Sequence, residues 1–481
     1  MKVQKAAEKA KTEVKQFCDV GAAQFLDLAD AAETSYNRFI RTTDEDHKAA
    51  VDAFWRELNH RGYIYESKHE GWYCVSDETF YPESQVHLIL DPSTGRKLHA
   101  SMETGKEVNW TSETNYHFKL SAFKDRLLKH YGDDPNFIIP KERMNFVIKE
   151  VTAGLSDLSI SRPSSRLSWG IPVPGDESQT IYVWLDALIN YITATGYPRV
   201  DRNNQDWLWP PNCQVIGKDI IRFHCIYWPA FLMALDLPLP KQFLSHAHWT
   251  MNQEKMSKSL GNVVNPFFAM ERFGVDMIRY YMVRDGGIVD DAAYENSYII
   301  SRYKKDLQGG LGNMISRIVR SKKWKVSVSV QYAAERSEAQ PKWLTEWQAK
   351  INKYLAGYES QMTAVNPRNA VAFLIEIIYE TNRLFQVAEI WTKVKSDDAQ
   401  DIEHVALTVY AAADALRVAA IGLQPIMPDK MKTALDMLGV DPSKRTWEYA
   451  SAGHDLSFGE PLIDIEEGYE GSLFPPLTSD Y

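Results

Sequence analysis

The sequence predicts an α/β protein: an incomplete, doubly wound parallel sheet of the Rossmann type with a small β-rich insertion, followed by an all-α helical bundle. Short apolar runs alternate with helical patterns between residues 180 and 284. Aromatic and turn residues crowd 71–110, and long helical periodicities without strand signals follow Ser297. A chain of 481 residues has room for two or three domains. We therefore place one domain at 1–296, with an insertion at about 62–150, and a helical domain at 297–481.

The composition is that of a soluble globular protein, with 44% hydrophobic and 25% charged residues. The longest strongly apolar run, Cys225 to Leu235, contains Pro229 and is too short to cross a bilayer, so it predicts a buried helix and no membrane partner. The four cysteines are far apart and include no C-x-x-C pair, which indicates reduced thiols and no zinc site.

The net charge of -10 disfavours indiscriminate binding to nucleic acid. One stretch, 302–325, is locally basic and carries eight lysines or arginines against the single acid Asp306. It is either a solvated basic face or a surface for a polyanion.

The first forty residues are amphipathic and rich in lysine, but acidic residues recur through them. Organelle presequences are poor in acids, so this segment predicts folded helix and not a targeting segment. A second helix is expected at 46–61, and helical patterning returns at Leu120. No strand signal precedes the first helical pattern.

The α/β region alternates strand and helix signals along the chain. The predicted strands are 180–184, 213–217 and 243–251, and the predicted helices are 185–197, 218–235 and 266–283. Ligands of such sheets bind at the carboxyl ends of the strands, where the loops "WLDA", "GKDI" and "NQEKMSKSLGN" should converge. We therefore expect Lys255 and Lys258 to lie over one crevice.

Four blocks carry a resemblance to a known family. "KMSKS" at 255–259 is similar to the signature loop of class I aminoacyl-tRNA synthetases. "WGIPVPGDESQTIYVWLDALINY", "VIGKDIIRFHCIYWPAF" and "GLGNMISR" resemble methionyl-tRNA synthetases of the mitochondrial or bacterial type, and the similarity covers essentially the whole chain. The resemblance implies that the helical domain binds an anticodon.

The resemblance implies a methionine–tRNA ligase: ATP-dependent activation of methionine to methionyl adenylate, and transfer to the 3′ end of tRNA(Met) for mitochondrial translation. It implies ATP with Mg²⁺ as the substrate complex, and tRNA(Met) with a CAU anticodon and methionine as partners. It further implies a monomer in the mitochondrial matrix, with the cytoplasm as the alternative.

ATP binding is carried over to Lys255, Ser257, Lys258 and Asp219. The methionine carboxylate attacks the α-phosphate, and two ammonium groups can stabilise the charge that develops on the leaving pyrophosphate. Arg162 resembles the family's arginine that pairs with the aspartate and positions the loop. The alternatives are an exposed basic loop and, for Asp219, a helix N-cap.

A pocket for methionine is implied around the first two loops. An apolar, polarizable thioether is well matched by aromatic and aliphatic walls. Taken singly, each residue is equally explained as core. The residues are Val183, Trp184, Ala187, Leu188, Tyr191, Ile220 and His224.

Anticodon recognition is carried over to three residues. Asn313 and Arg317 are four apart, hence on one face of a helix, and lie within the basic stretch. Trp391 follows a long helical pattern. Hydrogen bonds to base edges and stacking on unstacked bases are the chemistry such residues offer.

Two departures from the family stand out. Segment 72–86, where many relatives carry a zinc knuckle, has one cysteine, so no metal is predicted. No His-Ile-Gly-His-like motif is present. The family places that motif ahead of the first residues here, with the first strand, the phosphate-binding histidines and the aspartate that holds the amino group.

We therefore expect residues 1–481 alone to form no measurable methionyl adenylate, while the helical domain still prefers a CAU anticodon. An incomplete gene model, an internal start and a separately encoded complement are the open explanations. A non-catalytic tRNA-binding remnant and another class I synthetase are the alternative functions. The editing insertion of isoleucyl, leucyl and valyl enzymes and the zinc-ligand cysteines of cysteinyl enzymes are missing from the sequence.

Overall fold

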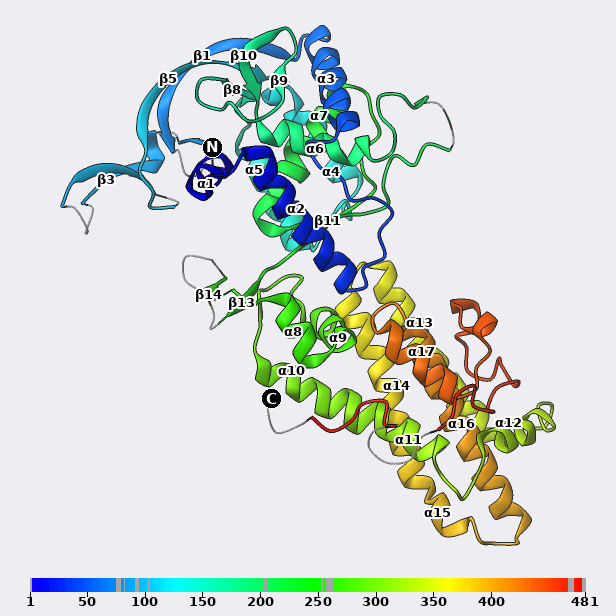
Figure 1. The fold of residues 1–481 in the computed structure, drawn as a ribbon. Helices are drawn as coiled ribbons and strands as arrows, with labels where there is room; N and C mark the ends of the chain where they lie inside the picture. Colours follow the sequence, from blue (N-terminus) through cyan, green and yellow to red (C-terminus); the bar gives the residue numbers. More distant parts are fainter. Residues whose placement is uncertain are drawn as a thin grey trace. The chain divides into compact units, whose positions relative to one another are not determined.

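The computed structural model describes most of the chain as two compact units. The described residues are 2–74, 79–81, 83–90, 95–102, 104–202, 204, 206–251, 254–256, 263–465 and 471–477. The N-terminal unit comprises Met1–Asp30 and Thr34–His246, and the C-terminal unit comprises Ala31–Glu33 and Ala247–Tyr481. Figure 1 draws the chain as a ribbon coloured along the sequence, with the helices and strands of each unit labelled. The predicted domain boundary at 296/297 lies within the C-terminal unit.

The N-terminal segment is helical, as predicted. It forms α1 (Lys2–Ala10), α2 (Val14–Ala31) and α3 (Glu45–His60). Helix α3 begins with two acidic residues, which favour the positive end of the helix dipole. Its apolar residues recur three and four apart, so one face of the helix is buried in the core.

The predicted β-rich insertion is also confirmed. Two long antiparallel strands, β1 (Ile64–Cys74) and β5 (Asn109–Phe118), are paired over their length and form the curved ribbon labelled in Figure 1. A separate hairpin joins β3 (Val86–Leu90) and β4 (Lys97–Ser101). The sheet of β1 and β5 is completed by β2 (Thr79–Tyr81) and β7 (Leu158–Ser159), and the 3-10 turn η1 spans Glu83–Gln85.

The N-terminal unit contains a parallel sheet. Its described strands run in the order β11 (Gln214–Gly217), β12 (Phe243–His246) and β6 (Ile138–Ile139). The sequence predicted β11 and β12, but it placed Ile138–Ile139 inside the insertion. A two-residue strand has no periodicity to detect, so only pairing with Phe243 and Leu244 reveals it.

The interpretation of 180–184 as a parallel strand is wrong. The strand there, β10 (Asp176–Ile181), is antiparallel to both β8 (Ser161–Pro163) and β9 (Pro172–Val173). It ends at Ile181, and Val183 already opens helix α6 (Val183–Thr193). A short apolar run that crosses a strand end and a helix start looks like one strand because the helical period has not yet begun.

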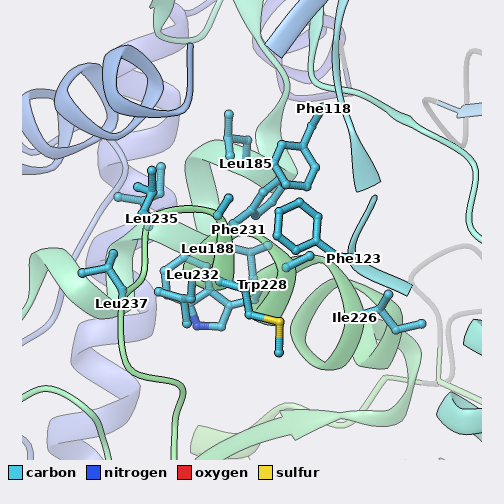
Figure 2. Close-up of a cluster of buried hydrophobic side chains, with 14 of the residues drawn as sticks. Phe118, Phe123, Leu185, Leu188, Ile226, Trp228, Phe231, Leu232, Leu235 and Leu237 are labelled. Atoms are coloured by element: carbon cyan, nitrogen blue, oxygen red, sulfur yellow. The ribbon is translucent and has the colours of Figure 1, made fainter. Parts of the chain in front are cut away.

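The predicted buried helix at 225–235 is confirmed as the core of this unit. Helix α7 (Trp228–Ala234) buries all seven of its residues. It continues the π-helical turn η4 (Phe223–Tyr227), which follows the 3-10 turn η3 (Lys218–Ile220). Figure 2 shows Trp228 and Phe231 beside Leu185, Leu188 and Phe118, and the rings of Phe118 and Phe231 meet at 4.7 Å. The turn η2 (Leu120–Phe123), α4 (Lys124–Asp133) and α5 (Lys141–Ala153) complete the unit.

The C-terminal unit begins with a small sheet of β13 (Trp249–Met251), β14 (Glu254–Lys255) and β15 (Ala292–Ala293). The predicted strand 243–251 is thus two strands in different sheets. The predicted helix 266–283 is also divided, into α8 (Pro266–Phe273) and α9 (Val275–Asp285). Gly274 between them has a φ of 87°, a left-handed conformation that interrupts a helix.

The predicted helical bundle is confirmed after residue 296. Helix α16 (Ala399–Leu423) contains an 18-residue segment that is long and apolar enough to cross a bilayer, but 89% of this segment is buried inside the protein. The bundle helices are α10 (Asn296–Arg302), the π-helix η5 (Tyr303–Gly312), α11 (Asn313–Val319), α12 (Val326–Ala334), α13 (Lys342–Thr363), α14 (Pro367–Ala388), α15 (Ile390–Lys393), α16 (Ala399–Leu423) and α17 (Pro428–Met437). The 3-10 turns Pro442–Lys444 and Trp447–Tyr449 follow.

Candidate functional site

Helix α6 presents an aromatic face to the candidate methionine site. Trp184, Ala187 and Tyr191 are three and four residues apart, so they share one face of the helix. The Trp184 ring stacks on Phe223 of η4 with centroids 3.6 Å apart and planes 10° apart. Phe223 was not predicted as a site residue, and its place directly before His224 was the one signal for it in the sequence.

His224 and Tyr191 form a hydrogen-bonded pair at this face. His224 Nδ1 lies 3.0 Å from the carbonyl oxygen of Ile220, and Nε2 lies 2.8 Å from the Tyr191 hydroxyl. Because a carbonyl can only accept, Nδ1 carries the proton, and Nε2 accepts from the hydroxyl. Burial lowers the pKa of His224 and raises the pKa of Tyr191 to about 12. Both groups are therefore neutral at physiological pH.

The remaining predicted methionine residues differ in exposure. Val183 is 42% exposed, whereas Trp184, Ala187 and Ile220 are half-buried. Leu188 is buried in the core cluster around α7. The accessible part of the face is thus aromatic and aliphatic, with one neutral hydroxyl–imidazole pair, which suits an apolar, polarizable side chain.

Arg162 lies on β8 close to the start of α6. It is buried, donates hydrogen bonds to the Ser159 hydroxyl at 2.8 Å and the Ser161 carbonyl at 2.7 Å, and its guanidinium lies 4.4 Å from the Tyr182 ring centre. Asp219 is exposed in η3. The N-cap of that turn is Gly217, so the alternative that Asp219 caps a helix is wrong. The pairing of Arg162 with Asp219 stays a prediction.

The lysine loop belongs to the C-terminal unit. The backbone of Lys255 pairs with Thr250 in the β13–β14 ladder. Ser257 and Lys258 lie outside the described residues. The predicted convergence of both lysines with α6 therefore stays a prediction based on their chemistry.

His47 and Asp186 form a buried pair between α3 and α6 that was not predicted from the sequence. His47 of α3 is fully buried, with Nε2 2.7 Å from Asp186 Oδ1 and Nδ1 3.3 Å from the Thr193 hydroxyl. Burial raises the pKa of Asp186 against the opposing effect of His47. At about 100° per residue, Asp186 and Thr193 lie roughly opposite Trp184 on the helix.

The three predicted anticodon residues lie in the bundle, and two of them are brought together. Asn313 and Arg317 both belong to α11, with Asn313 exposed. The Arg317 guanidinium lies 5.8 Å from the ring centre of Trp391, which is 37% exposed, and 4.9 Å from that of Phe385. Burial lowers the pKa of Arg317. Phe385 was not predicted at this site, because its position fits the regular apolar pattern of α14.

Among the residues that the structure describes, there is no group of three or more histidine, cysteine or carboxylate side chains placed to bind one ion. Residues 75–78, which follow Cys74, are outside that description.

Known families match both parts of the chain. The family described as "tRNA synthetases class I (M)" matches residues 1–319, and "Anticodon binding domain of methionyl tRNA ligase" matches residues 333–464. The probable mitochondrial methionine–tRNA ligase of Neurospora crassa is 49% identical over all of this chain and 78% of its own length. The Schizosaccharomyces pombe protein of the same description is 45% identical over 94% of this chain and 83% of its own.

A solved structure agrees with this assignment. Mycobacterium tuberculosis methionyl-tRNA synthetase in complex with methionyl-adenylate superposes with a TM-score of 0.87 at 34% identity, over 99% of this chain and 90% of the other. The family matches, the identities and the superposition agree over nearly the entire sequence. The chain belongs to the methionyl-tRNA synthetase family of class I aminoacyl-tRNA synthetases.

Proposed function

We propose that the protein is a methionine–tRNA ligase, which activates methionine with ATP and transfers it to the 3′ end of tRNA(Met). The observation that carries the proposal is the neutral aromatic face of α6 and η4, in a chain that aligns throughout with methionine–tRNA ligases. The face offers stacking and dispersion contacts to a thioether and no formal charge, so it favours methionine over charged amino acids of similar length.

Activation needs stabilisation of the leaving pyrophosphate. The methionine carboxylate forms a bond to the α-phosphorus of ATP as the bond to pyrophosphate breaks. Lys255 and Lys258, with Ser257 and Asp219, are the proposed ATP-binding residues, and the lysines would meet the charge as it develops. ATP would arrive as its Mg²⁺ complex, and we propose no zinc in this protein.

Selection of tRNA is assigned to the bundle. Arg317 and Trp391 lie together, and Trp391 is partly exposed, which suits stacking on an unpaired base. Asn313 is exposed on the same helix as Arg317 and can bond to a base edge. We propose a CAU anticodon as the target, with the protein acting as a monomer without a membrane partner.

The location follows the relatives. The relatives of Neurospora crassa, Schizosaccharomyces pombe and Mus musculus are described as mitochondrial. We propose the mitochondrial matrix, with the cytoplasm as the alternative. Imaging of the endogenously tagged protein tests this directly.

The test of function is methionine-dependent ATP–pyrophosphate exchange, followed by charging of tRNA(Met). It is run on residues 1–481 and on the product of the whole reading frame. Lys258→Ala should slow exchange about 10²-fold, whereas Lys241→Ala, at an exposed lysine, should not. Trp391→Ala should weaken tRNA binding by roughly 1–3 kcal/mol and leave exchange intact.

The second candidate function is a tRNA-binding protein without ligase activity. The sequence holds no His-Ile-Gly-His-like motif, which favours this candidate for residues 1–481 alone. Binding of tRNA(Met) with no exchange by either polypeptide would decide for it. Exchange by the whole reading-frame product would decide for the ligase.

A further inference from the structure

A buried carboxylate joins three helices in the C-terminal unit. Asp306 of η5 is 0% exposed. One of its oxygens accepts a hydrogen bond from the Tyr280 hydroxyl of α9 at 2.7 Å, and the other accepts from the Tyr379 hydroxyl of α14. A single side chain therefore fixes η5 against two helices from other parts of the chain.

The charge of this carboxylate is compensated. Arg302, one turn earlier, places Nη1 3.5 Å from Asp306 and binds Asp285 through Nε and Nη2, both at 2.8 Å. Burial raises the pKa of both Tyr280 and Tyr379, so both hydroxyls stay protonated and remain donors at neutral pH. A buried charge with several donors is stable in one geometry and costly to move.

The element that Asp306 holds is a π-helix. Residues Tyr303–Gly312 are wound more widely than an α-helix and lead without a break into α11. A Cβ at Gly309 would lie 2.9 Å from the Lys304 carbonyl oxygen, so glycine permits this winding. A one-residue slip between π and α winding would turn every later residue by about 100°.

Two of the helices fixed by Asp306 lead into those that carry the predicted anticodon residues. Helix α11 continues η5 and holds Asn313 and Arg317, and α14 holds Tyr379 and ends two residues before the helix that contains Trp391. We propose that Asp306 is a positioning residue for anticodon recognition. Through Tyr280 and Tyr379 it sets the winding of η5, and so the direction in which Asn313 and Arg317 are presented. The inference rests on the proposed anticodon-binding role of those residues.

The test measures anticodon discrimination by the full chain. Dissociation constants are determined for tRNA(Met) transcripts with the CAU anticodon and with a single base changed. The variants are Asp306→Asn and the milder Tyr379→Phe, which removes one hydroxyl. The matched control is Tyr358→Phe, at a buried tyrosine of the bundle whose hydroxyl donates to the Gly422 carbonyl at 3.2 Å.

Discrimination is the dissociation constant for the changed anticodon divided by that for CAU. Tyr379→Phe should lower this ratio about tenfold, equivalent to about 1.4 kcal/mol, while Tyr358→Phe leaves it unchanged. A folded Tyr379→Phe variant with unchanged discrimination would overturn the inference, as would an equal loss of affinity for both transcripts. Trp391→Ala distinguishes failure of the Asp306 inference from failure of the proposed anticodon site. If Trp391→Ala also leaves discrimination unchanged, the anticodon assignment itself fails. If it alone reduces discrimination, only the role of Asp306 fails.

Discussion

At the scale of single residues, the Tyr191–His224 contact described at the candidate methionine site is neutral, and we expect this to favour methionine over charged amino acids. The Tyr191 hydroxyl donates to His224, whose other nitrogen is committed to the Ile220 carbonyl. Neither group offers a counter-charge, so a lysine or glutamate side chain placed here would lose hydration without an ion pair. Methionine loses almost nothing, because its thioether is a weak hydrogen-bond acceptor.

Tyr191→Phe should raise the KM for methionine about tenfold and change kcat little. In the variant, His224 Nε2 has lost its donor and can be hydrated only while the site is empty, so methionine binding costs about 1–3 kcal/mol more. The kinetics of methionine-dependent ATP–pyrophosphate exchange measure this KM. Tyr227→Phe, on the same π-helix as His224, is the control. Equal effects of the two variants would contradict a specific role for the Tyr191 hydroxyl.

The pH dependence of methionine binding should come from the same pair. The pKa of His224 is lowered from 6.5 by burial, so the folded state holds the neutral ring. For a depressed histidine pKa, the stabilisation is present above 6.5 and is lost as pH falls through the lower folded value. A protonated ring can no longer accept the hydrogen bond from Tyr191, so methionine affinity should be flat above pH 6.5 and fall only in acid. A His224→Gln variant should lose the acid limb, and an unchanged limb would assign it to another group.

At the scale of secondary structure, the sequence predicted the helices with repeating apolar positions but missed strand features that depend on pairing with distant parts of the chain. The helices α3 and α14 follow from their repeating apolar positions. The two-residue strand β6 and the antiparallel setting of β10 depend on partners far along the chain. The sequence likewise supplied the residue types of the site through family resemblance, but not the 3.6 Å stack of Phe223 on Trp184.

The pair of His47 and Asp186 shows the same limit and gives an element-scale prediction. These residues are 139 positions apart, and only folding reveals that α3 holds the back of α6. His47→Ala leaves a buried carboxylate without its partner and should lower the free energy of unfolding of the N-terminal unit by about 1–3 kcal/mol. It should also raise the KM for methionine, because α6 loses its fixed rotation.

Thermal unfolding and exchange kinetics together check this prediction. His60→Ala is the matched control, since His60 ends the same helix and is exposed. A loss of stability with an unchanged KM would show that the pair supports the core without positioning the site. An unchanged stability would contradict both parts.

At the scale of the whole molecule, the two units differ in how completely they cover their apolar surface. In the C-terminal unit, α16 buries every residue from Leu407 to Leu423 inside the bundle. In the N-terminal unit, the parallel sheet has β11 at one edge, with β12 its one neighbour among the described strands. Parallel strands are normally covered on both faces, and unpaired edges invite association.

Val215 exposes an apolar side chain on this edge strand. It lies on β11 and is 62% exposed, whereas its neighbour Ile216 is 2% exposed. We expect residues 1–481 to associate at high concentration through this edge, and the N-terminal unit to unfold at a lower temperature than the bundle. Val215→Lys should shift sedimentation profiles toward the monomer, because a charged edge cannot pair with another copy without desolvation.

The matched control is Val328→Lys, at a valine of α12 that is 59% exposed. It adds the same charge to the bundle at a similarly exposed position, so any effect of net charge alone appears in both variants. Association suppressed by Val215→Lys and not by Val328→Lys would place the contact at β11. Equal suppression, or a wild-type chain that stays monomeric throughout, would show that the edge of β11 does not drive association.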